Sequence, residues 1–273
     1  MTMLKTNQYL LAIVALAGLN HLAIAQDNAE DLAKKLANPI ASLTSVPFQF
    51  NYDENMGSDD TGDRVLLNFQ PVIPVSLSDD WNLISRTIIP VITQDNVLGD
   101  GSSQSGLGDT IQSAFFSPKA LTASGWTWGI GPVFLLPTGT DDLLGTDQWG
   151  AGPTAVALKQ SGPWTYGVLA NHVWSETGDR VNQQAINSSF MQPFWSYTTK
   201  EAVTYTLNTE STYNWASDSD EWAVPINMMV AKVLKVGEQM LSVRGGARYW
   251  AESTDSGPEG WGLRMEFVLL YPK

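Results

Sequence analysis

Hydrophobic and polar residues alternate with a period of two along most of this chain. From Ser45 onward the alternation recurs in segments of about ten residues, separated by turn-forming residues. In the segment 260–272, for example, apolar residues alternate with Gly262, Arg264 and Glu266. This pattern predicts strands with one apolar and one polar face. We expect twelve strands, at 44–52, 64–77, 81–93, 109–117, 125–138, 152–160, 164–175, 187–198, 202–214, 221–233, 240–251 and 260–272.

Long and short connections alternate between these segments. The long ones lie near 53–63, 94–108, 139–151, 176–186, 215–220 and 252–259, and the short ones near 78–80, 118–124, 161–163, 199–201 and 235–238. Outer-membrane barrels have short periplasmic turns, longer extracellular loops and an even number of strands. We therefore predict an all-β fold, a transmembrane antiparallel β-barrel over residues 44–273 with both ends on the periplasmic side.

Aromatic residues gather near the two ends of the outward, apolar faces. Those expected at the periplasmic ends are Trp81, Trp126, Trp164 and Tyr271, and those near the extracellular ends are Tyr52, Trp174, Tyr213, Trp222, Tyr249 and Trp261. A barrel in lipid carries two such aromatic girdles. In a β-sandwich, the alternative fold, the same residues would form the core. A sandwich, however, does not explain why long and short connections alternate.

The first 25 residues have the features of a secretory signal peptide. Lys5 precedes an apolar run at 9–18, and Ala23-Ile24-Ala25 supplies the small residues of a cleavage site. The run is shorter than the ~20 residues of a membrane-spanning helix, and a buried N-terminal helix is the alternative. We expect residues 1–25 to be removed after Ala25 and the protein to reach the outer membrane of a Gram-negative bacterium.

A short amphipathic helix is predicted within the N-terminal segment 26–43. Its apolar stripe, spaced i, i+3, i+4, consists of Ala29, Leu32, Ala33, Leu36 and Ala37. The helix should end at Asn38-Pro39, because the residue before a proline disfavours helical dihedrals. The stripe must rest on another surface. That surface is either the end of the main domain or the interior of the barrel, in which case the helix is a plug.

The net charge and the absence of cysteine exclude several classes of function. Lys and Arg number 15 against 28 Asp and Glu, and the formal net charge is −13, which argues against a nucleic-acid partner. The chain has no Cys, so disulfides, thiolate metal sites and cysteine nucleophiles are excluded. No cofactor is expected.

Acidic residues concentrate in the long connections. They are Asp53, Glu54, Asp59, Asp60 and Asp63 in the first, Asp141, Asp142 and Asp147 in the third, and Asp218, Asp220 and Glu221 in the fifth. Oxygen ligands of this kind suit Ca²⁺ or Mg²⁺, but no stretch has the spacing of a calcium-binding loop. We interpret these residues as solvated loops beside lipopolysaccharide, bridged to it by divalent cations, and predict no dedicated metal site.

Charged residues on the polar faces are expected to line the lumen. They are Arg86, Glu210, Arg244, Arg248, Arg264 and Glu266. We expect Trp250 to pair with Gly262 across the last hairpin. Arg248 then faces Arg264, and Glu266 relieves only part of their repulsion. Two interpretations stay open, an anion-selective constriction and a structural network that keeps buried charges paired.

The remaining inward positions are mixed in polarity. Ile84, Ile88, Val133, Leu135, Leu169 and Val173 also face the predicted lumen. Twelve strands lie between the filled eight-stranded barrels and the open porins of 16–18 strands. The lumen should therefore be narrow and amphipathic, which suits a small, partly apolar solute.

One feature favours an enzyme instead. Beyond the expected signal peptide, His172 is the only histidine, and a hairpin symmetric about its loop places Ser189 opposite it. A Ser–His pair on the outside of a barrel near the outer leaflet is what an outer-membrane lipid hydrolase would need. No third group is evident, and a histidine at the lipid interface is commonly part of an aromatic girdle. We therefore predict that the protein is not an enzyme.

Several segments resemble one family of bacterial envelope proteins. They are DLAKKLANPIASL (31–43), VPFQFNYDEN (46–55), SQSGLGDTIQSAFFSPK (103–119), GPVFLLPT (131–138), GPTAVALKQSGPWTYGVLANHVWS (152–175), LNTESTYNW (207–215) and GPEGWGLRMEFVLLYPK (257–273). In these the chain resembles the phenol-degradation meta-pathway (MetA) family of outer-membrane transporter barrels, whose relatives are labelled "transporter" or "neuromedin U". The last residue of an outer-membrane barrel is usually aromatic. In this chain Pro272 and Lys273 follow Tyr271, so it departs from that pattern.

The resemblance implies an outer-membrane channel or transporter for small, aromatic or amphipathic solutes. It brings no catalytic residue with it. A purely structural or adhesive barrel is the alternative, ahead of the lipid hydrolase. The expected partners are outer-membrane lipid, lipopolysaccharide, a small-molecule solute and the barrel-assembly machinery. The sequence predicts no oligomeric state.

Overall fold

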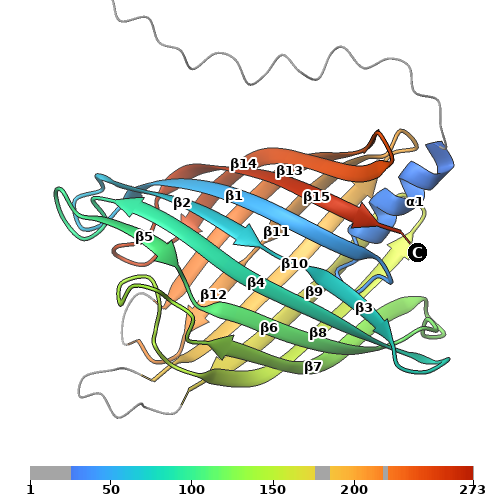
Figure 1. Ribbon diagram of the computed structural model, residues 1–273, viewed down its shortest axis with the longest axis horizontal. Helices are drawn as coiled ribbons and strands as arrows, with labels where there is room; N and C mark the ends of the chain where they lie inside the picture. The colour runs from blue at the N-terminus through green and yellow to red at the C-terminus, as the bar shows by residue number, and fades with distance from the viewer. Residues whose placement is uncertain (1–25, 176–184, 218–220, 273) are drawn as a thin grey trace, which may run out of the picture.

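The computed structural model describes residues 26–175, 185–217 and 221–272. The expected signal peptide lies outside the described residues. One antiparallel sheet closes on itself into a barrel of twelve strands, with a single short helix at one end (Figure 1). The predicted all-β barrel is confirmed.

The barrel is built from short and long strand elements that follow one helix. The helix α1 covers Gln26–Leu36. The strands are β1 Thr44–Met56, β2 Gly62–Phe69, β3 Val72–Ser76, β4 Trp81–Asp95, β5 Ser103–Leu107, β6 Thr110–Pro118, β7 Trp126–Leu136, β8 Gly150–Ser161, β9 Trp164–Trp174, β10 Asn187–Thr198, β11 Val203–Thr209, β12 Ser211–Asn214, β13 Trp222–Val236, β14 Gln239–Glu252 and β15 Gly260–Tyr271.

Three of the twelve strands consist of two elements each. β2 and β3 are separated at Gln70-Pro71, β5 and β6 at Gly108-Asp109, and β11 and β12 at Glu210. Proline has no N–H to give to a sheet ladder, which accounts for the first break. Each strand pairs with its neighbours in the sequence, and β1 pairs with β15 to close the ring. Closure leaves no exposed sheet edge.

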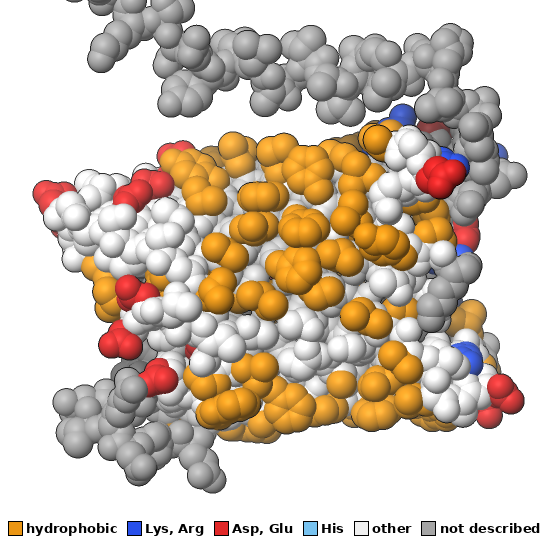
Figure 2. Space-filling view, viewed as in Figure 1, with side chains coloured by type: hydrophobic (Ala, Val, Ile, Leu, Met, Phe, Trp, Pro, Cys, Tyr) orange, Lys and Arg blue, Asp and Glu red, His pale blue; other side chains and the backbone are white. Residues whose placement is uncertain are grey.

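The outer surface is apolar, as the alternation predicts. Figure 2 shows many hydrophobic side chains spread across the middle of the visible face. Aromatic pairs lie near both ends of the outward faces, with ring centroids 4.8–6.0 Å apart: Trp81–Trp128, Trp126–Tyr166, Trp164–Tyr197, Tyr213–Trp222 and Tyr249–Trp261. The described structure thus carries the two aromatic girdles expected of a barrel in lipid.

The two ends of the barrel differ as predicted. We call the end with the short connections, including 162–163 and 237–238, the turn end, and the opposite end the loop end. Asp and Glu side chains gather at the loop end on the left of Figure 2. The first long connection is shorter than expected, because β1 continues to Met56 and β2 begins at Gly62. Asp53, Glu54 and Asp63 are therefore strand residues, and their assignment to an acidic loop was wrong.

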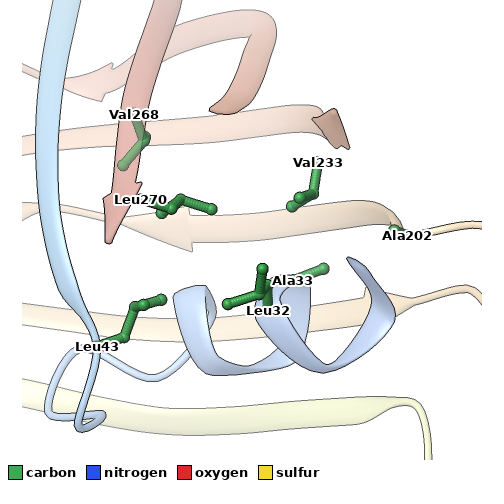
Figure 3. Packing of buried hydrophobic residues seen from close by; sticks show 7 residues of the cluster. All are labelled: Leu32, Ala33, Leu43, Ala202, Val233, Val268 and Leu270. Carbon is green, nitrogen blue, oxygen red and sulfur yellow. The ribbon is translucent and has the colours of Figure 1, made fainter. Parts of the chain in front are cut away.

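The helix α1 lies in the mouth of the barrel at the turn end (Figures 1 and 3). Leu32 and Ala33 are buried against Val233, Val268 and Leu270, the last three of which point into the lumen. The segment after the helix goes further in: Ile40 is 3% exposed and packs among apolar lumen side chains. The helix was expected either to pack against the end of the main domain or to plug the interior of the barrel. The second expectation describes this arrangement better. No helix in the described part of the chain is both long and apolar enough to cross a membrane.

The difference between the two ends predicts which side of the membrane each faces. If short turns are periplasmic, cysteines introduced at the exposed positions Asp59, Asp142 and Asp255 should react with an impermeant maleimide on intact cells. Cysteines at Lys200 and Glu238, in exposed turns at the opposite end, should react only after lysis. The natural chain has no Cys, so the background is low. The opposite labelling pattern would reverse this orientation.

Candidate functional site

One half of the lumen is filled by an apolar cluster. Ile84, Phe115, Val156, Leu158, Leu169 and Phe194 come from strands β4 to β10 and are all nearly inaccessible. Ile40 closes the cluster from the side of the plug. Three of the inward apolar positions predicted from the sequence, Ile84, Val133 and Leu169, are buried inside the barrel. This half therefore leaves no wide water-filled path.

The charges of the lumen come mainly from the strands opposite this cluster, whereas Arg86 lies on β4, the strand that also carries Ile84. All six predicted residues point inward, and the structure adds Asp53 and Arg64 to them. The ion pairs are Arg64–Asp53 at 3.5 Å, Arg244–Glu266 at 3.1 Å, Arg248–Asp53 at 3.3 Å, Arg248–Glu210 at 3.8 Å and Arg264–Glu210 at 2.7 Å. We call these seven residues, together with Arg86, the lumen network.

Arg264 and Glu210 form the centre of the lumen network. The Nη1 and Nη2 atoms of Arg264 each donate to one Glu210 oxygen at 2.7 Å, and its Nε donates to Asn51 Oδ1 at 2.6 Å. Arg264 is only 2% exposed, yet its guanidinium is paired and hydrogen-bonded. Because Glu210 sits at the break between β11 and β12, this bidentate pair crosses the lumen from β15. It narrows the passage.

A second group of charges lies closer to the loop end. Arg248 Nη1 donates to Asp53 Oδ2 at 3.3 Å, and its guanidinium stacks over the Trp250 ring at 4.4 Å. The Trp250 indole N–H donates to the other Asp53 oxygen at 2.9 Å. Asp53 is fully buried and also faces Arg64. These contacts hold a carboxylate in the lumen wall.

The predicted register of the last hairpin was wrong by two residues. Trp250 pairs with Gly260, so Arg248 lies opposite Gly262 and Arg264 opposite Gly246. Glu266 lies opposite Arg244 and pairs with it directly. The expected contact between two like charges is thus replaced by contacts between each arginine and a glycine.

Those two positions, Gly246 and Gly262, leave no room for a side chain, because the neighbouring strands lie close to them. A Cβ built on Gly246 would lie 2.0 Å from the carbonyl oxygen of Met228, and one on Gly262 would lie 2.9 Å from Asp53 Oδ1. A side chain at either position would push against the backbone or the lumen network. Glycine is therefore the residue that fits at both positions in this register.

The sequence analysis missed Asp53 and Arg64. Both share the strand face of residues already recognised as inward, since Asp53 follows Gln49 and Asn51 at steps of two along β1. Extending the alternation past residue 52 would have found Asp53, and Arg64 begins the predicted strand 64–77 on the same face as Asn68. For Asp53 the loop assignment hid this signal, because runs of acidic residues are usually solvated.

A cavity of about 160 Å³ lies between α1 and the centre of the lumen network. Its charged lining residues from the strands are Arg86, Arg244, Arg264, Glu210 and Glu266, and its apolar ones include Leu43, Val72, Phe194 and Met229. The predicted narrow and amphipathic lumen therefore describes this space. Across the whole lumen network, five arginines face three carboxylates.

The Ser–His pair of the rival hypothesis is present on the outer surface. Ser189 pairs with His172 across β9 and β10, as the symmetric hairpin predicted, and His172 Nδ1 lies 2.7 Å from Ser189 Oγ. The indole N–H of Trp215 also donates to Ser189 Oγ, at 2.9 Å. His172 Nε2 is buried, and no described residue bonds to it. The third member of a triad is therefore missing from the described residues.

The acidic loops form no metal centre in the described part of the chain. No group of three or more His, Asp or Glu side chains gathers there in a way that could hold an ion. Asp109 instead ties the third long connection, accepting from the backbone N–H groups of Gly139 and Thr146 at 3.0 and 2.6 Å. Asp218 and Asp220 lie outside the described residues.

Comparisons with known proteins support the fold. No family model matches the chain, and no curated protein matches its sequence. Among solved structures, an outer membrane channel from Pseudomonas putida F1 has a TM-score of 0.65 at 14% identity, over 84% of this chain and 96% of that one. The beta domain of a Bordetella autotransporter gives 0.48 at 9% identity, over 84% and 100% of the two chains. The outer membrane phospholipase of Salmonella typhi gives 0.46 at 14% identity, over 89% and 98%. The chain has the fold of an outer-membrane barrel.

Proposed function

We propose that the protein is a channel or transporter for small, aromatic or amphipathic solutes in the outer membrane of a Gram-negative bacterium. The observation that carries this proposal is the cavity beneath the lumen network, which combines charged and apolar walls inside an apolar-coated barrel. The resemblance of the sequence to the phenol-degradation meta-pathway family agrees with such a solute. Outer-membrane lipid, lipopolysaccharide and the barrel-assembly machinery are the partners that this location requires.

The lumen suits selective passage better than bulk flow. The apolar cluster fills one half, the Arg264–Glu210 pair crosses the other, and α1 occupies the mouth at the turn end. A solute must displace or pass these elements, so conductance should be small. Positive charge exceeds negative charge in the lumen network, and a narrow passage of low dielectric amplifies such an excess.

A reversal potential measured under a salt gradient tests this proposal. We expect a small conductance with a weak preference for anions, because the lumen network has five arginines and three carboxylates. Arg86→Gln should reduce the preference, whereas Lys119→Gln, in an exposed turn, should leave it unchanged. Preference for cations in the wild type would contradict the proposal. Absence of any conductance or solute-driven liposome swelling would favour a structural or adhesive barrel.

One contact favours a second candidate function, a lipid hydrolase. It is the 2.7 Å contact between His172 Nδ1 and Ser189 Oγ beside Trp174 and Trp215, on the outer face near the loop end. A nucleophile also needs an oriented base, and His172 Nε2 has no partner among the described residues. We expect the purified protein to release no fatty acid from phospholipid vesicles. Release that is lost in both Ser189→Ala and His172→Ala would establish the hydrolase.

A further inference from the structure

We propose that the lumen cavity is a binding site for one small organic monoanion, with a carboxylate head and an apolar body of about one aromatic ring. This inference rests on the proposed function only in that a solute must be able to enter the lumen. It goes beyond passage of a solute, because it assigns a binding site of defined charge and size within the lumen. Three properties of the cavity lead to it: its charge balance, its free donors and its dimensions.

Among the described charged residues around the cavity, one arginine has no carboxylate partner. Arg264 is paired with Glu210 and Arg244 with Glu266, but Arg86 has no carboxylate within ion-pair distance among the described residues. Lys35, at the helix end of the cavity, is already paired with Asp31 at 2.6 Å. A single anion in the cavity would therefore balance its wall. Arg86 is half-buried in the wall of the cavity. A charge without a partner in such a confined place is costly, which is the reason to expect such an anion.

Arg86 also has donors to spare. Its described hydrogen bond is one from Nη2 to the neutral Gln70 Oε1, at 3.0 Å, whereas a guanidinium carries five N–H groups. Both glutamates that line the cavity are held by other donors: Glu210 by Arg264 and Gln192, and Glu266 by Arg244 and Gln49. Arg86 is thus the guanidinium best placed to grip an incoming carboxylate in the bidentate manner that arginine favours.

The size and the apolar lining select the rest of the ligand. A cavity of about 150 Å³ in another protein holds benzene, and this one measures about 160 Å³. Phe194 and Met229, 7% and 4% exposed, line it together with Leu43 and Val72. A ring-sized body fits this space and would be removed from water there. A sugar chain or a phospholipid is too large, and an inorganic anion would leave the apolar lining unused.

Calorimetric titration of the detergent-solubilised full chain with benzoate, benzamide and acetate tests the site. Benzamide has the shape of benzoate without its charge, and acetate has the head without the ring. We expect benzoate to bind saturably, one per chain, about 10-fold or more tighter than either of the others, since a charged hydrogen bond and a buried ring each contribute at least that factor.

Substitutions at Arg86 show whether that residue holds the carboxylate. In Arg86→Gln the preference for benzoate over benzamide should vanish, whereas Arg86→Lys should keep part of it. Lys119→Gln, which removes a positive charge from an exposed turn, is the matched control and should bind as the wild type does. Each variant should first show the faster gel mobility of an unheated, folded barrel.

The possible outcomes separate this inference from the proposed function. Equal affinity for benzoate and benzamide in the wild type, or a preference that survives in Arg86→Gln, would overturn the binding site whatever the conductance. A protein that binds benzoate as expected but neither conducts nor admits solutes into liposomes would keep the site and overturn the channel. Binding that acetate or chloride matches would mean a bare anion site, and the ligand class proposed here would be wrong.

Discussion

Releasing α1 from the mouth of the barrel is expected to raise the single-channel conductance several-fold. The variant Leu32→Asp places a carboxylate in an apolar cluster where Leu32 is now 1% exposed. An unpaired charge cannot stay in such a cluster without a cost of several kcal/mol, so the helix should leave the mouth. Deletion of residues 26–37 should have the same effect. Planar-bilayer recording measures both.

The exposed neighbour of Leu32 supplies the control. Asp31→Asn changes the charge of the helix on its solvent side and leaves the buried stripe intact, so the conductance should stay near that of the wild type. Barrel closure does not depend on the helix, because the pairing of β1 with β15 begins at Thr44. If Leu32→Asp and the deletion both fold and conduct as the wild type does, the limiting constriction lies at the Arg264–Glu210 pair and not at the plug.

Glu210→Gln is expected to lower the free energy of unfolding by about 3–5 kcal/mol, the usual cost of removing one partner from a buried ion pair. The substitution leaves Arg264, 2% exposed, facing an amide in place of two carboxylate oxygens. The positive excess of the lumen network also rises, so the preference for anions should increase. Urea titration of the folded form, followed by gel mobility without heating, measures the stability.

Removing both partners should reverse most of that loss. In Glu210→Gln/Arg264→Gln no buried charge is left without its partner, and replacing a buried pair entirely costs little. Glu238→Gln, in an exposed turn, should leave stability unchanged. A double variant as unstable as Glu210→Gln alone would show that the loss comes from contacts other than this ion pair.

The faces of the strands could be predicted from the sequence because they depend on a local rule. Side chains alternate between the two faces of a strand, and lipid tolerates no charge on one of them. The rule placed Arg244, Arg248 and Arg264 inside the barrel, and the structure has them there. It also placed the aromatic girdles on the outward faces. The same alternation along β1 places Asp53 inside the barrel, but the predicted strand ended one residue before it.

Register could be predicted for one hairpin and not for another. A shift of two residues leaves every side chain on its own face, so the alternation cannot tell Trp250–Gly260 from Trp250–Gly262. Symmetry about the loop gave the correct pairing of His172 with Ser189. In the last hairpin packing restricts the pairing, since a side chain at Gly246 or Gly262 would press on the neighbouring strands. Such contacts between distant residues have no signature in a single sequence.

The position of the helix was equally beyond local rules. The stripe that includes Leu32 predicted burial, but it did not say against what. The answer depends on Val233, Val268 and Leu270, which are on strands near the other end of the chain. Their inward faces are apolar only at the turn end, and the charged residues follow toward the loop end. That change along the strands was present in the sequence and could have favoured the plug.

The contact between α1 and the last strand has a consequence for the order of folding. Leu32 is among the first described residues of the chain, and Leu270 among the last, yet they share one cluster. The surface that receives the helix is incomplete until β15 has joined β1. Contacts between such distant segments form late, because the entropy of closing a long loop must first be overcome. A fluorescent probe on α1 would therefore report the moment at which β15 joins β1. Before that moment the mouth at the turn end would not be occupied by the helix.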